Sequence, residues 1–238
     1  MANLTQLRML EDLDGFLLVD KPAGLPFSTV VKTVKRKFNL VKVGHGGALD
    51  AMASGLMVLL VNGANRFVGD VMGADRDYTG TMRLGRRTST GDIHGETVAE
   101  RPAAPAEGRM DAALAEFRGD IFQTEPRFCT VRREDRASYE IADTGEHGQI
   151  LAHVYRLSVE PAGEGRLSFA VSGTKALIVR ALVDGFGEAL GCGACVETLR
   201  RTRTGRFVVD EAVPFDRLLE TDIGDFASCV KPVTAFSR

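Results

Sequence analysis

The sequence predicts an α+β fold in which helices flank a mixed, largely antiparallel β-sheet. Segments of strand and helix periodicity follow one another without the regular strand–helix–strand alternation of parallel sheets. Two alternating apolar segments within 151–171 are joined by a turn over 161–165, which is typical of an antiparallel hairpin. The chain has 238 residues, 44% of them hydrophobic and 26% charged. A chain of this length can form one large domain or two small ones, and we expect a single domain over 1–238.

The first part of the chain predicts two strands separated by a helix and a turn. Residues 15–19 are an apolar strand, and Ser28 is placed to cap a helix from 29 to 38. A glycine-rich turn over 44–50 precedes a second apolar strand over 56–61. The helix has apolar residues on one side and Lys32, Lys35 and Arg36 on the other, so we expect its basic face to point outward.

The remaining elements alternate irregularly between strand and helix. We expect a strand over 76–84, a polar loop over 85–95 and a helix over 110–117. A second helix over 178–190 stops at a glycine, and a strand over 195–203 follows it. In the hairpin, period-two alternation predicts that one face carries Leu151, His153, Tyr155, Leu157 and Val159.

The four cysteines favour packing over metal binding. Cys192 and Cys195 form a CxxC pair, which suits a redox site or half of a zinc site. Cys129 and Cys229 belong to no second pair, so we expect small packed side chains and no metal. No apolar run reaches the ~18 residues of a membrane helix, and the first residues do not resemble a signal peptide. These features predict a cytoplasmic protein, and nothing demands more than a monomer.

Basic residues are concentrated in acid-free stretches although the net charge is -2. Residues 21–49 contain six Lys or Arg and no acid, and residues 198–207 contain four Arg and no acid. A third group, diluted by acids, consists of Arg127, Arg132, Arg133 and Arg136. Such runs are usually solvated faces, but two of them in a mildly acidic protein suggest a phosphate-binding surface.

The most informative stretch is GHGGALDAMASG, residues 44–55. Its glycines let the backbone approach a ligand and adopt positive φ, and Asp50 stands directly before an apolar strand. An Asp beside glycines most often serves in an Asx turn or a helix cap. From composition alone, that structural role and a functional carboxylate both remain open.

Five blocks in order resemble the TruB-type pseudouridine synthases. DKPAGLPFSTVVKTVKRKF and KVGHGGALDAMASGLMVLLV are similar to that family's DKPxGxTS and VGHTGTLDPxATG, and DYTGTMRLGRRTSTGDIHGE to its tyrosine strand and loop. QTEPRFCTVRREDRASYEIADTGE and VRALVDGFGEALGCGACVETLRRTRTGRF resemble its middle block and its arginine helix with the LRR strand. The blocks cover residues 15–207 and leave a short C-terminal extension over 208–238, where many relatives carry a further RNA-binding domain.

The resemblance implies isomerisation of a uridine in the T loop of tRNA to pseudouridine, without cofactor, metal or ATP. Asp50 is then the catalytic carboxylate, acting on the ribose either as a nucleophile or as a base. Arg180 is expected to pair with Asp50, Tyr78 to stack on the uracil, and His45 to fill the space that the flipped base vacates. Leu199 and Ile178 are expected to line the base pocket. The residues expected to contact the RNA backbone are Lys32, Lys35, Arg36, Lys42, Arg200, Arg201 and Arg203.

Several positions depart from the family pattern. Gly46 and Ala48 stand in place of threonines, and Ile178 replaces a tyrosine that lines the uracil pocket. Asp135 and Asp143 replace a glycine and an arginine of the middle block. Two other hypotheses therefore stay open: a tRNA-binding folding chaperone without catalysis, and a pseudouridine synthase for a different RNA.

Overall fold

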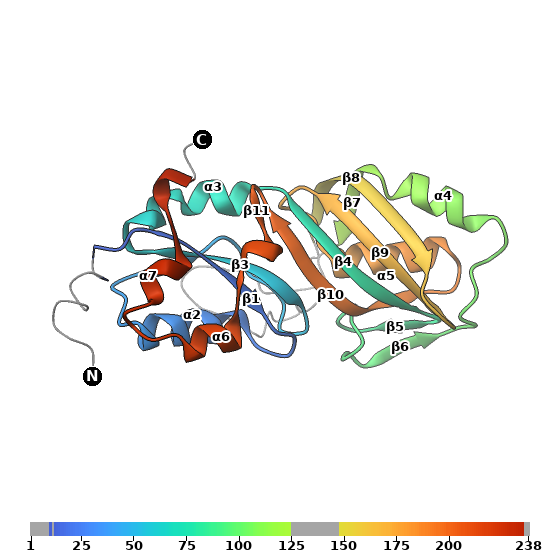
Figure 1. The fold of residues 1–238 in the computed structure, drawn as a ribbon. Helices are drawn as coiled ribbons and strands as arrows, with labels where there is room; N and C mark the ends of the chain where they lie inside the picture. The colour runs from blue at the N-terminus through green and yellow to red at the C-terminus, as the bar shows by residue number, and fades with distance from the viewer. Residues whose placement is uncertain (1–9, 11, 125–147, 236–238) are drawn as a thin grey trace. The chain divides into compact units, whose positions relative to one another are not determined.

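The structure, a computed structural model, describes residues 10, 12–124 and 148–235. Its contacts divide the chain into two compact units (Figure 1). Unit 1 contains Met1–Arg76 and Arg200–Arg238, and unit 2 contains Asp77–Leu199. Each unit is described by itself.

Unit 1 is built on the antiparallel pair of β1 (Gly15–Lys21) and β3 (Ser54–Val61), whose pairing runs without a break from one end to the other. Both strands are almost wholly buried, which explains their continuous apolar sequences. Arg200 and Arg201 of β10 (Ala194–Thr204) pair in parallel with the start of β3. Shorter strands complete the sheet: β2 (Val43–His45), β11 (Phe207–Val208), β12 (Val213–Pro214) and β13 (Val230–Pro232).

Apolar clusters lie against this sheet. One cluster contains Phe16, Leu18, Leu56 and Phe207 together with Val71, which comes from a short helix. A second contact stacks Phe38, which follows the N-terminal helix, on Phe226 with ring centroids 3.8 Å apart. The helical segments of unit 1 are α2 (Phe27–Lys37), η1 (Asn62–Phe67), α3 (Val68–Gly73), η2 (Val209–Glu211), α6 (Phe215–Glu220), α7 (Phe226–Cys229) and η3 (Val233–Ala235).

Unit 2 carries a second set of paired strands. Its order is β10, β4 (Arg76–Leu84), β9 (Arg166–Gly173), β8 (Gln149–Pro161) and β7 (Gly119–Thr124). A separate hairpin pairs β5 (Arg86–Thr88) with β6 (Thr97–Glu100). The helices of unit 2 are α4 (Arg109–Glu116) and α5 (Val179–Ala189).

The predicted hairpin is present, but the prediction of its faces is wrong. In β8 the side chains of Ala152, Val154 and Leu157 are buried, whereas Leu151 and Tyr155 are 54% and 49% exposed. The pairing of β8 with β9 shifts register between Val154 and Arg156. This irregularity moves the buried face from even to odd positions, and a strict period of two cannot anticipate it.

The predicted N-terminal helix is also present, with a different start. It begins at Phe27 after the N-cap residue Pro26, and no side chain caps it. The prediction of Ser28 as the cap is therefore wrong, because Ser28 already lies inside the first turn. Pro26 has an extended conformation with φ of -60° and ψ of 136°, so the helical backbone begins at the next residue.

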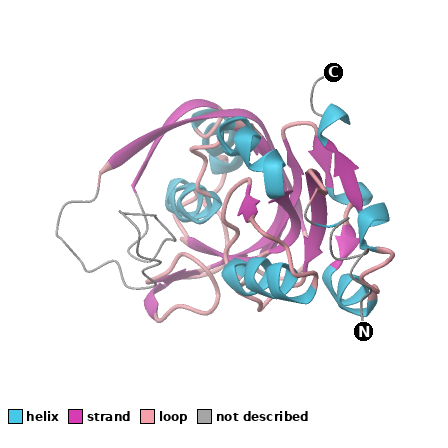
Figure 2. Cartoon of the chain, turned by 90° about the vertical axis from the view of Figure 1, so that its left-hand side faces the viewer, coloured by secondary structure: helices cyan, strands magenta, loops and turns pink. Residues whose placement is uncertain are grey.

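The α+β fold class is confirmed, with a mixed and mostly antiparallel arrangement of strands beside helices (Figure 2). That the whole chain is a single domain stays a prediction. None of the described helices has the length and apolar character needed to cross a membrane. Most of the predicted middle block, which covers residues 123–146, lies outside the described residues, including its four arginines and Cys129.

Candidate active site

Asp50 lies in unit 1, in the turn between β2 and β3, with a partly exposed side chain. Its carbonyl accepts a hydrogen bond from the Ala53 amide at 3.1 Å, which closes the turn. Gly47 has φ of 129°, and a Cβ there would lie 2.6 Å from the Arg76 guanidinium. A larger residue at this position is therefore strained and crowded, so the glycine-rich sequence follows from the path of the backbone.

Two buried cations hold the backbone on both sides of Asp50. The Nζ of Lys21 donates to the carbonyl of Ala51 at 3.1 Å, and also to those of Pro22 and Leu25. Arg201 donates to the carbonyls of Ala48 at 2.9 Å and Gly47 at 3.3 Å. The two cations are 0% and 1% exposed. The position of the turn is therefore set by charged hydrogen bonds to its main chain.

Strand register brings these cations to the turn. Lys21 pairs with Gly55 across β1 and β3, and Arg201 pairs with the same Gly55 across β3 and β10. Gly55 has φ of 103°, and a Cβ there would lie 2.3 Å from the carbonyl oxygen of Arg201. Lys21, Gly55 and Arg201 thus occupy one register position across three neighbouring strands. The central position of the three needs glycine.

The prediction that Arg201 contacts the RNA backbone is wrong. Its side chain is buried, and its guanidinium also donates to the carbonyl of Leu56 at 2.8 Å. A guanidinium that is 1% exposed and bonded to three carbonyls offers no surface to a phosphate. This burial has no local sign in the sequence, because Arg201 follows another arginine in a basic stretch.

Electrostatics link Lys21 to Asp50. Burial lowers the pKa of Lys21 to about 8, the Asp50 carboxylate acts in the opposite direction, and Arg201 adds a smaller lowering. The ammonium group therefore attracts the Asp50 carboxylate from the buried side of the turn. These contacts give Lys21 a supporting role at the turn that carries Asp50.

The other predicted RNA-contacting residues of unit 1 remain at the surface. Lys32, Lys35 and Arg36 are exposed on α2, opposite its buried Val30 and Val34, and Lys42 is exposed after the helix. The outward basic face of this helix is confirmed.

Two arginines of β10 have partners within the protein. Arg200 forms a bidentate ion pair with Asp20 at 2.7 and 2.9 Å, and its side chain is 39% exposed. Arg203 donates to the carbonyl of Gly205 at 2.7 Å. Both remain partly accessible, and their contact with RNA stays a prediction. Asp20 was missed, although it precedes Lys21 in the DKP motif.

His45 is the last residue of β2. Its Nδ1 accepts a hydrogen bond from the Gly47 amide at 3.3 Å, and its ring meets that of Phe27 edge-on at 5.1 Å. These contacts give the imidazole a fixed orientation beside the turn. Its role in base flipping stays a prediction.

Tyr78, Leu199, Ile178 and Arg180 belong to unit 2. Tyr78 lies on β4 and Leu199 on the neighbouring β10, with 7% and 6% exposure. The backbone of Ile178 exchanges two hydrogen bonds of 3.0 Å with the side chain of Gln123. This pairing fixes the main chain at residue 178 whatever its side chain.

Arg180 is the second residue of α5 and is 5% exposed. Its guanidinium donates to the carbonyl of Thr90. The loop that carries Thr90 is shaped by Asp92, whose carboxylate accepts from the Thr90 hydroxyl and the His94 amide at 3.0 Å. The role of Asp92 was not predicted, although an Asp after Ser, Thr and Gly is a recognisable turn signal.

Among the described residues, no group of three or more His, Cys, Asp or Glu side chains is placed to hold a metal ion. Cys192 and Cys195 are free and buried, and burial raises the pKa of the Cys195 thiol to about 11. A thiol of this kind is a poor nucleophile at neutral pH.

Comparison with known proteins decides the family. A profile of the TruB family pseudouridylate synthase N-terminal domain matches residues 35–176, and one of the tRNA pseudouridylate synthase B C-terminal domain matches residues 180–235. The chain is 37% identical to tRNA pseudouridine synthase B of Burkholderia lata over 227 residues, covering 94% of this chain and 70% of that protein. The chain belongs to the TruB family. The predicted family is thereby confirmed.

Other TruB relatives and solved structures agree. The protein of the same name from Burkholderia pseudomallei is 39% identical over 210 residues, with 87% and 69% coverage. A chain of a Cbf5–Nop10–Gar1 complex matches with a TM-score of 0.68 at 24% identity, over 95% of this chain and 62% of that one. A chain of an archaeal box H/ACA Nop10–Cbf5 complex matches with a TM-score of 0.63 at 27% identity, over 92% and 56%. This chain therefore spans less than two thirds of those two chains, and their likeness supports the fold.

Proposed function

We propose that this chain isomerises a uridine in the T loop of tRNA to pseudouridine, with Asp50 as the catalytic carboxylate. Membership of the TruB family supports the reaction, and the names of the relatives from Burkholderia support tRNA as the substrate. The observation that carries the role of Asp50 is its turn, whose backbone is held on one side by Arg201 and on the other by Lys21. A partly exposed carboxylate on a turn whose backbone is held in this way can meet a ribose with little rearrangement of the main chain.

The reaction exchanges one glycosidic bond for another. The bond from the ribose anomeric carbon to uracil N1 breaks, and a bond from the same carbon to C5 forms. C5 then loses its proton and N1 gains one, so substrate and product are isomers. Asp50 acts on the ribose either as a nucleophile at the anomeric carbon or as the base that removes a ribose proton. The exchange is redox-neutral, so we propose no cofactor.

Residues of unit 2 complete the proposed site. In this proposal Arg180 pairs with Asp50, Tyr78 stacks on the uracil, and Leu199 and Ile178 contact the base. The burial of Tyr78 and Leu199 on neighbouring strands supports an apolar place for a flipped base. His45 is proposed to fill the gap that the base leaves in the RNA stack.

Basic side chains are proposed to hold the RNA backbone. Lys32, Lys35, Arg36 and Lys42 are exposed, and Arg200 and Arg203 are partly exposed. Each contact with a phosphate releases counterions, so affinity for tRNA should fall steeply with salt. We further propose that the protein acts in the cytoplasm as a monomer.

The test compares RNA substrates labelled with tritium at uridine C5. Wild-type protein should release tritium from full-length tRNA and from a T-stem hairpin, at one uridine of the T loop. Binding of tRNA without release would favour the folding chaperone, for which the loss of the family tyrosine at Ile178 is the supporting observation. Release from ribosomal RNA alone would show a synthase for a different RNA.

A further inference from the structure

One face of α5 is polar along its whole length. Arg180, Asp184 and Glu188 are spaced four residues apart, so they lie one above the other on the helix. Each of them contacts the segment over residues 86–101, which contains the β5–β6 hairpin. Arg180 donates to the carbonyl of Thr90, in the loop of this hairpin.

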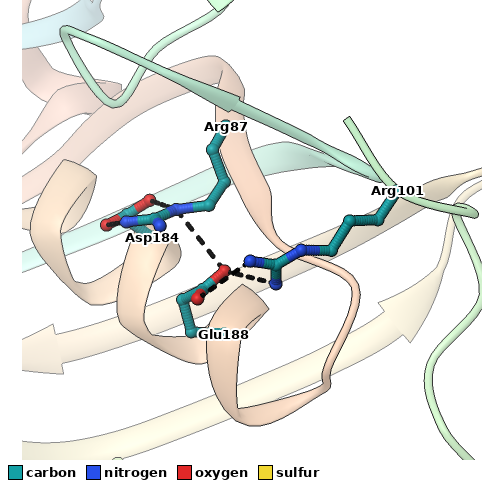
Figure 3. A network of polar contacts seen from close by, with 4 residues as sticks. All are labelled: Arg87, Arg101, Asp184 and Glu188. Carbon is teal, nitrogen blue, oxygen red and sulfur yellow. Dashed lines mark hydrogen bonds and ion pairs between the residues drawn. The ribbon is translucent and has the colours of Figure 1, made fainter. Parts of the chain in front are cut away.

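The next two contacts are ion pairs, drawn in Figure 3. Arg87 on β5 donates from Nε and from a terminal nitrogen to the two oxygens of Asp184, at 2.8 and 2.7 Å. Arg101, directly after β6, donates to the two oxygens of Glu188 at 2.8 and 3.3 Å. The Nε of Arg87 also lies 3.5 Å from the Oε1 of Glu188. Figure 3 shows both guanidinium groups pointing toward the helix.

The hairpin itself is attached to the strands of unit 2. The amide of Gly85 donates to the carbonyl of Gly193, and the amide of Ile93 donates to that of Val196 on β10. The amide of Val196 donates in turn to the carbonyl of Gly91. The polar contacts therefore connect α5 to the sheet through the segment over residues 86–101. Main-chain hydrogen bonds hold this segment in place.

The ion pairs contribute geometry more than free energy. Arg87 and Asp184 keep 30% and 31% of their side-chain exposure, and pairs of this kind stabilise a fold only weakly. A bidentate pair is nevertheless directional, because both N–H groups must align with both oxygens. A rotation or slide of α5 by one residue would break the contacts of Asp184 and Arg180 together, since the two side chains are one turn apart.

We propose that Arg87 and Asp184 are positioning residues for the isomerisation, because their pair sets the rotation and axial position of α5 and thereby places the Arg180 guanidinium. The inference rests on the proposed function only in the role that it gives to Arg180. Arg87 and Asp184 themselves need not touch the RNA.

The kinetic test uses Asp184→Asn, which keeps the size of the side chain and removes its charge. Its single-turnover rate on saturating tRNA should fall about 10-fold to 100-fold, while the Kd for tRNA stays unchanged. The single-turnover rate of Glu188→Gln should fall less than that of Asp184→Asn, because Glu188 is two helical turns from Arg180. The matched control is Arg166→Gln, which breaks a similar pair between Arg166 and Glu197 at 2.8 Å on β9 and β10. A wild-type rate in Asp184→Asn, or an equal loss in the control, would overturn the inference.

A second measurement does not depend on activity. In protein labelled with ¹⁵N-arginine, the Arg180 Nε–H signal, assigned with Arg180→Lys, should shift in Asp184→Asn and keep its position in Arg166→Gln. An unshifted signal in Asp184→Asn would refute the positioning role whichever RNA is the substrate. Absence of tritium release by the wild type would instead refute the proposed function, while the shift of the Arg180 signal would still support the inference.

Discussion

Lys21 and Arg201 are the residues that place Asp50. Both are buried cations whose hydrogen bonds go to main-chain carbonyls of the turn or of the segments that adjoin it. Asp50 was predictable, because its motif is contiguous and specific. The burial of Arg201 was not, because it depends on the pairing of strands that are about 150 residues apart in the chain.

The buried Lys21 makes stability depend on pH. Burial lowers its pKa to about 8 from 10.5, so between these values the folded protein holds it neutral while the unfolded chain keeps it protonated. The unfolded state then binds more protons, and a rise in pH favours folding. A shift of one pKa unit corresponds to roughly 1.4 kcal/mol. The free energy of unfolding of wild type, measured relative to that of Lys21→Met, should therefore rise by about 3 kcal/mol between pH 7.5 and 10.5.

Urea unfolding of both proteins across this range measures the gain. The comparison with Lys21→Met is needed because the raised pKa of Cys195 has the opposite effect on stability, and this effect is common to both proteins. A difference between the two proteins that does not change with pH would show that Lys21 is not desolvated in the folded state.

Ile178 stands where the family usually has a tyrosine. Its backbone is fixed by Gln123, so the side chain can change without moving the main chain. We expect Ile178→Tyr to keep or improve turnover on tRNA, because packing on the base is retained and a hydroxyl is added. Steady-state tritium release from labelled tRNA measures this. A loss of more than about tenfold would mean that the pocket has adapted to the smaller side chain.

Among the elements, periodicity predicted the main strands and helices, but the prediction of a loop over 85–95 is wrong in part, because β5 (Arg86–Thr88) lies there. It predicted the β8–β9 hairpin but assigned Leu151 and Tyr155 to the wrong face, because an irregularity near Val154 changes the parity. It predicted α2 and its outward basic face, although the helix starts earlier than Ser28 indicated. Local patterns thus predict elements well, whereas irregularities in pairing depend on the neighbouring strand.

The exposed basic face of α2 has a measurable consequence. Replacing Lys32, Lys35 and Arg36 together by Gln should weaken binding to tRNA and reduce the slope of log K against log salt by about one for each lost phosphate contact. The fold should persist, because the buried Val30 and Val34 are untouched. Filter binding at several salt concentrations measures both effects.

The control for this variant is Lys231→Gln, which removes a partly exposed cation that pairs with Glu211 on the same unit. It should leave the salt slope unchanged. Equal slopes for wild type and the triple variant would exclude α2 from the RNA interface.

At the scale of the whole molecule, the predicted site residues are divided between the two units. Asp50, His45 and the exposed basic residues belong to unit 1, and Tyr78, Arg180 and Leu199 belong to unit 2. The order of five motif blocks predicted the family, which the matches over 35–176 and 180–235 confirm. The supporting contacts of Asp20, Asp92 and Gln123 were not predicted, because each depends on a partner far away in the sequence or on the path of a loop.

The proposed isomerisation depends above all on the Asp50 carboxylate. The most direct test is single-turnover tritium release from C5-labelled tRNA by Asp50→Asn, with the Kd for the same tRNA measured in parallel. Release should fall by more than about a thousandfold while Kd stays within about threefold of wild type, because the amide keeps the shape and loses the charge. Pseudouridine formation by Asp50→Asn at the wild-type rate would contradict the proposed role of Asp50.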